Sequence, residues 1–216
     1  EGFLKNSKPF KKGDFSGGFL HAGVSELTMA CIMNGMALHG GIIPVCGTFF
    51  VFSDYMKPAF RMSALMRQQV IYVWTHDAFR VGEDGPTHQP VEHELQVRLM
   101  ESLKNHKGKN SMLVLRPADV DETTVAWKMA LENQDTPTAL ILSRQNVKSL
   151  PRKENKYNEA LGATKGAYIV KDCAGTADVI LLASGSEVST LFAATELLES
   201  RANLNVRIVS VPSEGL

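Results

Sequence analysis

Short apolar runs alternate along this chain with longer segments in which apolar residues recur at helical spacing. The runs fall at 42–45, 70–74, 112–115 and 138–142, and the helical segments fall at 24–38, 52–67, 91–103 and 119–132. Strands that are apolar throughout are typical of parallel sheets, because helices cover both of their faces. The alternation therefore predicts an α/β fold, a parallel sheet with helices on both faces.

A change of composition predicts a second unit. Lys, Arg, Asn and Glu dominate from 146 to 165, which is how an exposed linker between domains looks. Beyond it, strands are predicted at 167–170, 179–183 and 206–211, with a helix at 187–201 that Ser186 would cap. We expect this second α/β unit to be incomplete, because it ends just after a strand and lacks the neighbours that would cover its sheet.

These boundaries divide the chain into four parts. They are an N-terminal segment (1–20), a first domain (21–148), a linker (149–165) and the incomplete second unit (166–216).

Charge and composition argue against several kinds of partner. Lys plus Arg and Asp plus Glu each number 23, so no net charge favours nucleic acid or a membrane surface. The sequence has no apolar run long enough for a transmembrane helix and no signal-peptide core at its start. Its three cysteines lack disulfide or zinc spacing. A reducing compartment fits these features, and the cytoplasm is the default prediction.

Polar residues follow two of the predicted strands. Thr75-His76-Asp77 and the loop 82–90 come after one strand, and Ser143-Arg144-Gln145-Asn146 comes after another. Ligands bind beyond the carboxyl ends of strands in open parallel sheets. An ordinary Gly- and Pro-rich turn explains the first cluster equally well, and a surface arginine explains the second. If Arg144 lies in a site, its planar fork of donors suits a phosphate.

Two further features have both a structural and a functional interpretation. Phe49, Phe52 and Tyr55 are spaced three apart, so on a helix they would share one face and form an aromatic wall or part of the core. Glu26 opens the first predicted helix, where a carboxylate favours the helix dipole without any catalytic role.

Taken together, these clusters resemble transketolase in order and spacing over essentially the whole chain. His21-Ala22-Gly23-Val24-Ser25-Glu26 resembles the family's H-x-G-V-x-E, and Leu38-His39-Gly40-Gly41 follows it. The series continues with Thr48-Phe49, Thr75-His76-Asp77, Gly82-Glu83-Asp84-Gly85-Pro86-Thr87-His88-Gln89-Pro90 and Leu142-Ser143-Arg144-Gln145-Asn146. The resemblance implies the thiamine diphosphate-binding fold, with the pyrimidine-binding domain at 21–148 and the start of the C-terminal domain at 166–216.

The family's activity is the transfer of a two-carbon ketol unit from a ketose phosphate to an aldose phosphate, in the pentose phosphate pathway. The resemblance implies that Glu26 is the carboxylate that bonds the cofactor's aminopyrimidine and drives it to its imino form. Phe52, with Phe49 and Tyr55, matches the aromatic pocket around that ring.

The resemblance also assigns residues to the sugar-phosphate substrates. His76 and Arg144 match phosphate ligands, whereas Asp84 and His88 match groups that contact sugar hydroxyls. We expect His88 to transfer a proton at the substrate hydroxyl, because a neutral imidazole can accept and return a proton near pH 7.

Other parts of the family's active site fall outside this chain. The Mg or Ca ion on the cofactor's diphosphate is bound by an N-terminal domain with a GDG motif that is missing here, so no metal ligand is expected in this chain. The site forms between two subunits of a homodimer, so we expect the chain alone to be inactive. One subunit of a split transketolase and a non-catalytic transketolase-like binding protein are the alternatives. The joint presence of Glu26, His76, His88 and Arg144 disfavours the second.

Overall fold

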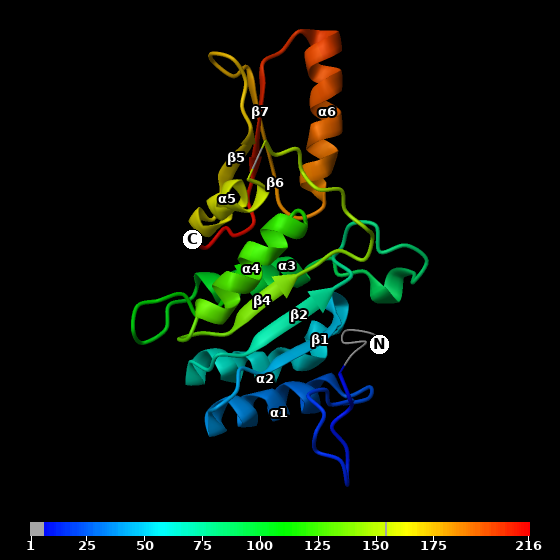
Figure 1. Cartoon of the computed structure of the whole chain (residues 1–216), viewed down its shortest axis with the longest axis vertical. Coiled ribbons are helices and arrows are strands. Elements are labelled where there is room, and N and C mark those ends of the chain that lie inside the picture. Colours follow the sequence, from blue (N-terminus) through cyan, green and yellow to red (C-terminus); the bar gives the residue numbers. More distant parts are fainter. Residues whose placement is uncertain (1–6, 154) are drawn as a thin grey trace.

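The computed structural model describes residues 7–153 and 155–216 (Figure 1). The first six residues of the predicted N-terminal segment, and Glu154 of the predicted linker, lie outside the described residues. Within the described part of the chain, no helix combines the length and apolar character needed to cross a bilayer.

Four parallel strands form the sheet of the first domain, in the order β1-β2-β4-β3. They are β1 (Val45–Phe49), β2 (Ile71–Thr75), β3 (Leu113–Leu115) and β4 (Thr138–Ile141). The two central strands, β2 and β4, are buried almost throughout because helices cover both faces.

Alternate residues of β2 show how the helices are distributed. The helices are α1 (Glu26–His39), α2 (Ser53–Met66), α3 (His93–Ser102) and α4 (Val120–Glu132). Tyr72 and Trp74 pack in one core cluster with residues of α1, α2 and α3, whereas Ile71 and Val73 pack in another with residues of α4. Successive strand residues point to opposite faces, so the predicted parallel sheet with helices on both faces is confirmed (Figure 1).

The predicted position of the first strand is wrong. The sequence placed a strand at 42–45, but β1 begins at Val45, and Ile42 and Ile43 are exposed. Two glycines with positive φ precede them, and Pro44 has no amide hydrogen for a strand ladder. The strand instead ends at Phe49 and continues into a short 3-10 helix, η1 (Phe50–Phe52).

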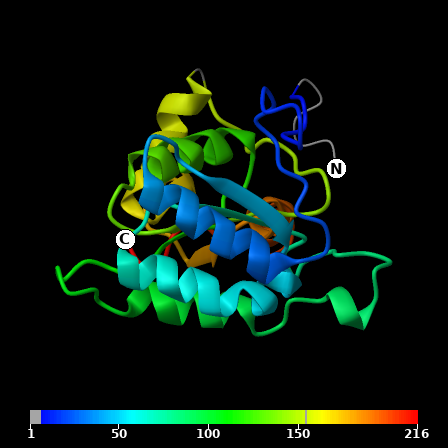
Figure 2. The ribbon, with the colours of Figure 1, turned by 90° about the horizontal axis from the view of Figure 1, so that it is seen from below.

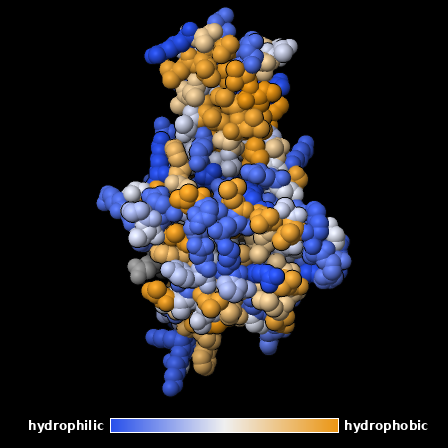
Figure 3. All heavy atoms as spheres, turned by 180° about the vertical axis from the view of Figure 1, so that it is seen from behind, coloured by the Kyte–Doolittle hydropathy of each residue, from blue (hydrophilic) through white to orange (hydrophobic). Residues whose placement is uncertain are grey.

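The second unit has its own three-stranded sheet, in the order β5-β7-β6. Its elements are β5 (Tyr168–Lys171), β6 (Val179–Ala183), α6 (Glu187–Ala202) and β7 (Val206–Ser210). The pair β6 and β7 is parallel, but β5 runs antiparallel to β7. Ile169, Ile180 and Leu182 remain exposed on these strands, and apolar side chains gather over this end of the molecule in Figure 3.

The predicted cap at Ser186 is also wrong. Ser186 precedes α6 as expected, but its backbone is already helical and its hydroxyl makes no capping bond. The hydroxyl instead donates to Glu187 Oε2 at 3.3 Å. A true N-cap side chain needs an extended backbone to reach the free amides of the first turn. At α4, by contrast, Asp119 accepts from the amide of Glu122 at 3.0 Å, which is a capping bond.

The segment predicted to be an exposed linker is folded and partly buried. It contains α5 (Lys156–Ala160) and a 3-10 helix, η3 (Leu161–Lys165). Ala160 and Ala163 pack against Val125 of α4. The side chain of Arg152 is buried because it pairs with Asp119 and Asp121. The polar composition of this segment therefore gave no sign of its apolar contacts with α4 or of the ion pairs that neutralise Arg152. The two units pack together through this segment.

Candidate functional site

The carboxyl ends of β1, β2 and β4 bring together most of the predicted site residues. Phe49 ends β1 and pairs in register with Thr75, which ends β2. His76 follows Thr75, and Arg144 lies just after β4, which is the other neighbour of β2. Because these strands are parallel, their carboxyl ends share one edge of the sheet. The predicted clusters at 75–77 and 143–146 therefore begin at this edge.

Three aromatic side chains form a wall at this edge. The rings of Phe49 and Phe52 lie nearly parallel, with centroids 6.0 Å apart, and Phe52 lies 6.1 Å from Tyr55. Phe49 also stacks on the imidazole of His76 at 3.5 Å. Phe49 and Phe52 are half-buried and Tyr55 is 62% exposed. These rings are thus accessible to a ligand, which core side chains are not.

His88 comes from the loop after β2 and folds back onto this wall. It ends the 3-10 helix η2 (Pro86–His88), and its ring meets Phe52 edge-on at 5.2 Å. Its Nδ1 lies 2.8 Å from the hydroxyl of Thr87. Gly85 allows the turn that leads into η2, because its φ of 76° favours glycine. The loop thereby places an imidazole beside the aromatic rings.

His76 has a backbone and a side chain that are both constrained. Its φ is 60°, which is uncommon for a residue with a Cβ, and its Nδ1 lies 3.0 Å from the hydroxyl of Thr75. Burial lowers the pKa of His76 from its usual value, and the charge of Asp84 opposes this shift, while Arg144 and His88 add to the lowering. The imidazole of His76 is therefore neutral near pH 7.

The charges around His76 predict how its pKa differs between the unaltered chain and two variants. We expect His76 to titrate below the usual histidine pKa of about 6.5. Asp84→Asn should lower the pKa of His76 further, because the imidazolium loses a stabilising negative charge. Arg144→Gln should raise it, because a repelling cation is removed. Titration of the histidine ring signals by NMR measures all three. A His76 pKa that is the same in the two variants would contradict the clustering of these groups.

Arg144 packs beneath the glycine-containing loop that carries Asp84. A Cβ on Gly82 would come within 3.3 Å of Arg144 Nη1, and Gly82 has a φ of 86°, so this position suits glycine alone. Arg144 Nε lies 3.9 Å from Asp84 Oδ2. Both side chains remain partly exposed at the sheet edge. The guanidinium therefore keeps donors available for an anion.

Glu26 makes no hydrogen bond or ion pair with the other predicted site residues, all of which lie in the described part of the chain. It is the first residue of α1 and is half-buried. Because α1 leads through 40–44 into the start of β1, the beginning of α1 lies at the same end of the domain as Phe49. Within residues 7–153 and 155–216, no hydrogen bond or ion pair holds its carboxylate. Its side chain is thus available for a bond to a ligand.

Asp77 belongs to a buried ion-pair network that the sequence did not predict. Although it follows His76, it is only 2% exposed and accepts from Arg116 Nη2 at 2.8 Å. Arg116 also donates to Glu187, the first residue of α6, and to the carbonyl of Ser184. Burial raises the pKa of Asp77, and Arg116 opposes that shift. This network joins the loop of the candidate site to the second unit.

A signal for this network was present in the sequence. Arg116 comes directly after β3, so it occupies the same kind of position as Arg144 after β4. An arginine at the carboxyl end of a buried strand must find a carboxylate partner or reach solvent. The sequence pattern identified the position of Arg144 but left Arg116 without a role.

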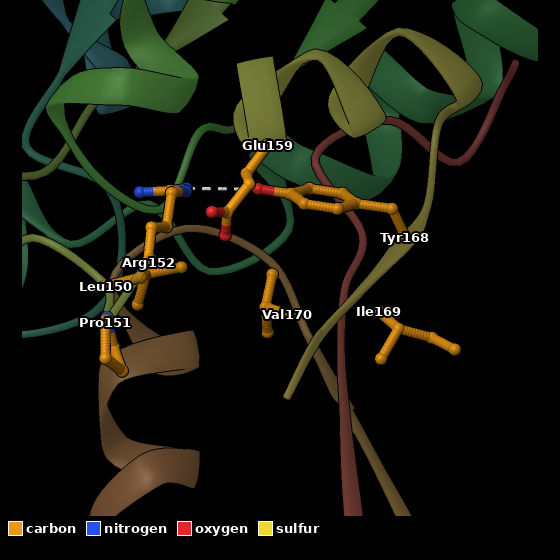
Figure 4. A pocket seen from close by; sticks show the side chains of 7 residues that line it. All are labelled: Leu150, Pro151, Arg152, Glu159, Tyr168, Ile169 and Val170. Atoms are coloured by element: carbon orange, nitrogen blue, oxygen red, sulfur yellow. Dashed lines mark hydrogen bonds between the residues drawn. The ribbon is translucent and has the colours of Figure 1, made fainter. Parts of the chain in front are cut away.

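A hollow of about 160 Å³ lies elsewhere, between the 149–165 segment and β5. It is lined by Leu150, Pro151, Arg152, Glu159, Tyr168, Ile169 and Val170 (Figure 4). Arg152 spans it and donates to the hydroxyl of Tyr168 at 3.1 Å. It shares no residue with the cluster at the carboxyl ends of the strands. We therefore assign the candidate site to that cluster and not to this hollow.

The chain's first domain is an α/β domain whose candidate site lies at the edge of an open parallel sheet, where folds of this class bind their ligands. A family model described as the transketolase pyrimidine-binding domain matches residues 4–149, and one described as the transketolase-like C-terminal domain matches residues 166–216. The chain belongs to the transketolase family.

Individual relatives support this assignment. The chain is 49% identical to a transketolase of Halalkalibacterium halodurans over 97% of its own length and 30% of the relative's length. It is 46% identical to a transketolase of Aquifex aeolicus, over 93% of this chain and 28% of that one. The chain therefore spans less than a third of the length of these curated relatives.

Solved structures also support the assignment to the transketolase family. A transketolase from Leishmania mexicana matches 97% of this chain and 29% of its own, with 40% identity and a TM-score of 0.82. A transketolase from Pichia stipitis in complex with sedoheptulose-7-phosphate matches 97% of this chain and 30% of its own, with 37% identity and a TM-score of 0.84. A split-gene transketolase, solved as an inactive β4 tetramer, shares the fold at 23% identity and a TM-score of 0.69 over 90% of this chain and 57% of its own.

Proposed function

We propose that this chain supplies the pyrimidine-binding half of a thiamine diphosphate-dependent active site, which moves a two-carbon ketol unit between ketose and aldose phosphates. The observation that carries the proposal is the cluster of His76, Asp84, His88 and Arg144 beside an accessible aromatic wall. The half-site would lie in the 21–148 part of the chain. The 166–216 part would belong to a C-terminal domain.

The residues at the start of α1 and α2 fit the aminopyrimidine of the cofactor. Glu26 has a half-buried carboxylate that no described residue holds, and Phe52 and Tyr55 present stacked, accessible rings. When bound, thiamine diphosphate supplies the nucleophilic carbon that takes up the ketol unit. Glu26 would hold a proton at the pyrimidine nitrogen, and Phe49 and Phe52 would exclude water from that contact, which strengthens it.

The other residues would hold the sugar phosphate. Arg144 would bind the phosphate through paired donors, and the neutral imidazole of His76 would add a further hydrogen bond. Asp84 and His88 would contact sugar hydroxyls. His88 would accept and return the proton of the reacting hydroxyl, because it extends from the loop to the aromatic wall.

The proposal also requires a second subunit. The cofactor's diphosphate and its Mg or Ca ion would be held by an N-terminal domain outside this chain, in a homodimer. The surface of α1 supports such a partner, since Val24 before the helix is 99% exposed and Leu27, Ile32 and Leu38 are also exposed. Figure 2 shows α1 on the outer side of the α1 and α2 layer. Leu27 and Leu38 are eleven residues apart and so share one face of α1, and exposed apolar side chains gathered in this way are typical of an interface.

A substitution at Arg144 tests the substrate class. In a mixture of this chain with a separately expressed N-terminal diphosphate domain, thiamine diphosphate and magnesium, Arg144→Gln should raise the KM for ribose 5-phosphate about 10- to 100-fold. A charge-assisted hydrogen bond contributes about 1.5–3 kcal/mol. The KM for an unphosphorylated aldose should change little.

Arg201→Gln is the matched control, because Arg201 lies in the last turn of α6, far along the chain from the cluster. It should leave both KM values unchanged. An equal loss with phosphorylated and unphosphorylated acceptors in Arg144→Gln would show that Arg144 does not bind the phosphate.

A further inference from the structure

Three potential metal ligands meet where α2 and α3 begin. Asp54 lies in the first turn of α2, Glu92 precedes α3, and His93 is the first residue of α3. One ligand atom from each of these residues lies within 4.8 Å of the ligand atoms of the other two. Glu92 and His93 are adjacent in the sequence, but Asp54 belongs to a distant segment, so the fold of the first domain creates the cluster.

The state of His93 distinguishes this cluster from an ordinary group of surface acids. Its side chain is only 4% exposed, and neither ring nitrogen has a hydrogen-bond partner among the described residues. A buried polar group usually has such a partner. Carboxylates at the start of two helices are common because they favour the helix dipoles, but that explanation leaves the imidazole unpaired.

The geometry between His93 and Asp54 suits two ligands of one ion. His93 Nε2 lies 3.1 Å from Asp54 Oδ2, yet this pair lacks hydrogen-bond geometry. Two ligands at about 2.1 Å from one ion lie about 3.4 Å apart in the tetrahedral geometry of Zn²⁺ and about 3 Å apart at the right angles of an octahedral ion, and the observed separation is close to both. Glu92 Oε2 lies 3.9 Å from the other ring nitrogen, and its exposed side chain can rotate toward the same ion.

We propose that Asp54, Glu92 and His93 form a binding site for a divalent transition metal ion, separate from the ion expected on the cofactor's diphosphate. Two carboxylates balance the charge of such an ion. One imidazole with two carboxylates suits Zn²⁺ or Mn²⁺, whereas Mg²⁺ prefers oxygen ligands alone. The sequence analysis expected no metal ligand in this chain, because the GDG motif that binds the ion on the diphosphate is missing from it.

The position of the site gives the ion a structural consequence. Asp54 lies between Phe52 and Tyr55 of the aromatic wall, and Glu92 follows the loop that carries His88. A bound ion would therefore tie the start of α2 to the end of that loop.

Calorimetric titration of the 216-residue chain with ZnCl₂, MnCl₂ and MgCl₂ in turn tests the proposal. We expect one Zn²⁺ per chain, weaker binding of Mn²⁺ at the same site, and no binding of Mg²⁺. Asp54→Asn, Glu92→Gln and His93→Gln should each weaken Zn²⁺ binding by at least about tenfold, since even the loss of a residue that only supports a metal ligand costs 10- to 100-fold.

Two control variants separate this site from adventitious binding. His106→Gln and Glu132→Gln remove an exposed imidazole and an exposed carboxylate elsewhere, and both should bind Zn²⁺ as the unaltered chain does. Because His93 is buried, Glu92→Gln is the decisive variant for a chain that must stay folded. The proposal is overturned if the folded chain binds neither Zn²⁺ nor Mn²⁺, or if Glu92→Gln and Asp54→Asn bind Zn²⁺ with unchanged affinity.

Discussion

Arg116→Met should lower the free energy of unfolding of this chain by about 3–5 kcal/mol, the usual cost of removing one partner from a buried ion pair. Arg116 pairs with Asp77 and Glu187, both at 2.8 Å, and lies 3.8 Å from Glu94. Its loss leaves three carboxylates close together, and Asp77 stays buried without a counterion. Urea denaturation followed by circular dichroism measures the loss.

The effect of pH on this variant has a defined sign. Burial already raises the pKa of Asp77, and the loss of Arg116 removes the main opposing charge. In the folded variant the pKa of Asp77 therefore lies above its unfolded value, so its protonation stabilises the folded state as pH falls. The stability deficit of Arg116→Met should shrink between neutral and mildly acidic pH.

Arg207→Met is the matched control for this prediction. Arg207 pairs with Asp172 at 2.7 Å, but this pair lies at the surface, where ion pairs contribute little. Its loss should destabilise the chain far less. A second control, Asp77→Asn combined with Arg116→Met, should recover part of the stability because no buried charge remains. Equal losses in Arg116→Met and Arg207→Met would contradict the buried network.

Glu26→Gln should reduce kcat for ketol transfer about 100- to 10,000-fold in the mixture of this chain with the N-terminal diphosphate domain, which is the usual range for a lost proton-transfer group. An amide keeps the shape of the carboxylate but cannot hold or release a proton at the pyrimidine nitrogen. Because Glu26 is half-buried and unpaired among the described residues, the fold should be little affected.

Glu83→Gln is the control for this loss. Glu83 is an exposed carboxylate in the loop after β2, and the proposal gives it no role. Its kcat should stay within about threefold of the unaltered chain, since surface substitutions change free energies by about 0.5 kcal/mol. A Glu26→Gln chain with nearly full kcat would remove Glu26 from the chemistry.

Much of the fold could be predicted because local patterns decide it. The apolar runs at 70–74 and 138–142 correspond to the two central strands, which helices cover on both faces. Prediction failed where one residue overrides a pattern, as Pro44 does before β1. It also failed in the 149–165 segment, because the burial of Arg152 depends on the carboxylates of Asp119 and Asp121 at the start of α4, which lie 33 and 31 residues earlier.

Like the fold, the candidate site could be predicted only where a local sequence pattern marks it. Polar residues just after a buried strand mark the edge of the sheet, so the sequence alone located His76 and Arg144. Their roles came from the family resemblance. The position of Arg116 after a buried strand gave a signal for its network, but its partners could not be predicted, because Asp77 and Glu187 lie 39 and 71 residues away along the chain. The metal cluster shares this property, since Asp54 meets His93 only in the folded domain.

The most direct test of the central claim is the rate of ketol transfer from xylulose 5-phosphate to ribose 5-phosphate when this chain is mixed with a separately expressed N-terminal diphosphate domain, thiamine diphosphate and magnesium. The account predicts a rate that requires both polypeptides, with neither active alone. Demonstrated assembly and cofactor binding without any transfer would contradict it, and would favour a transketolase-like binding protein that does not catalyse.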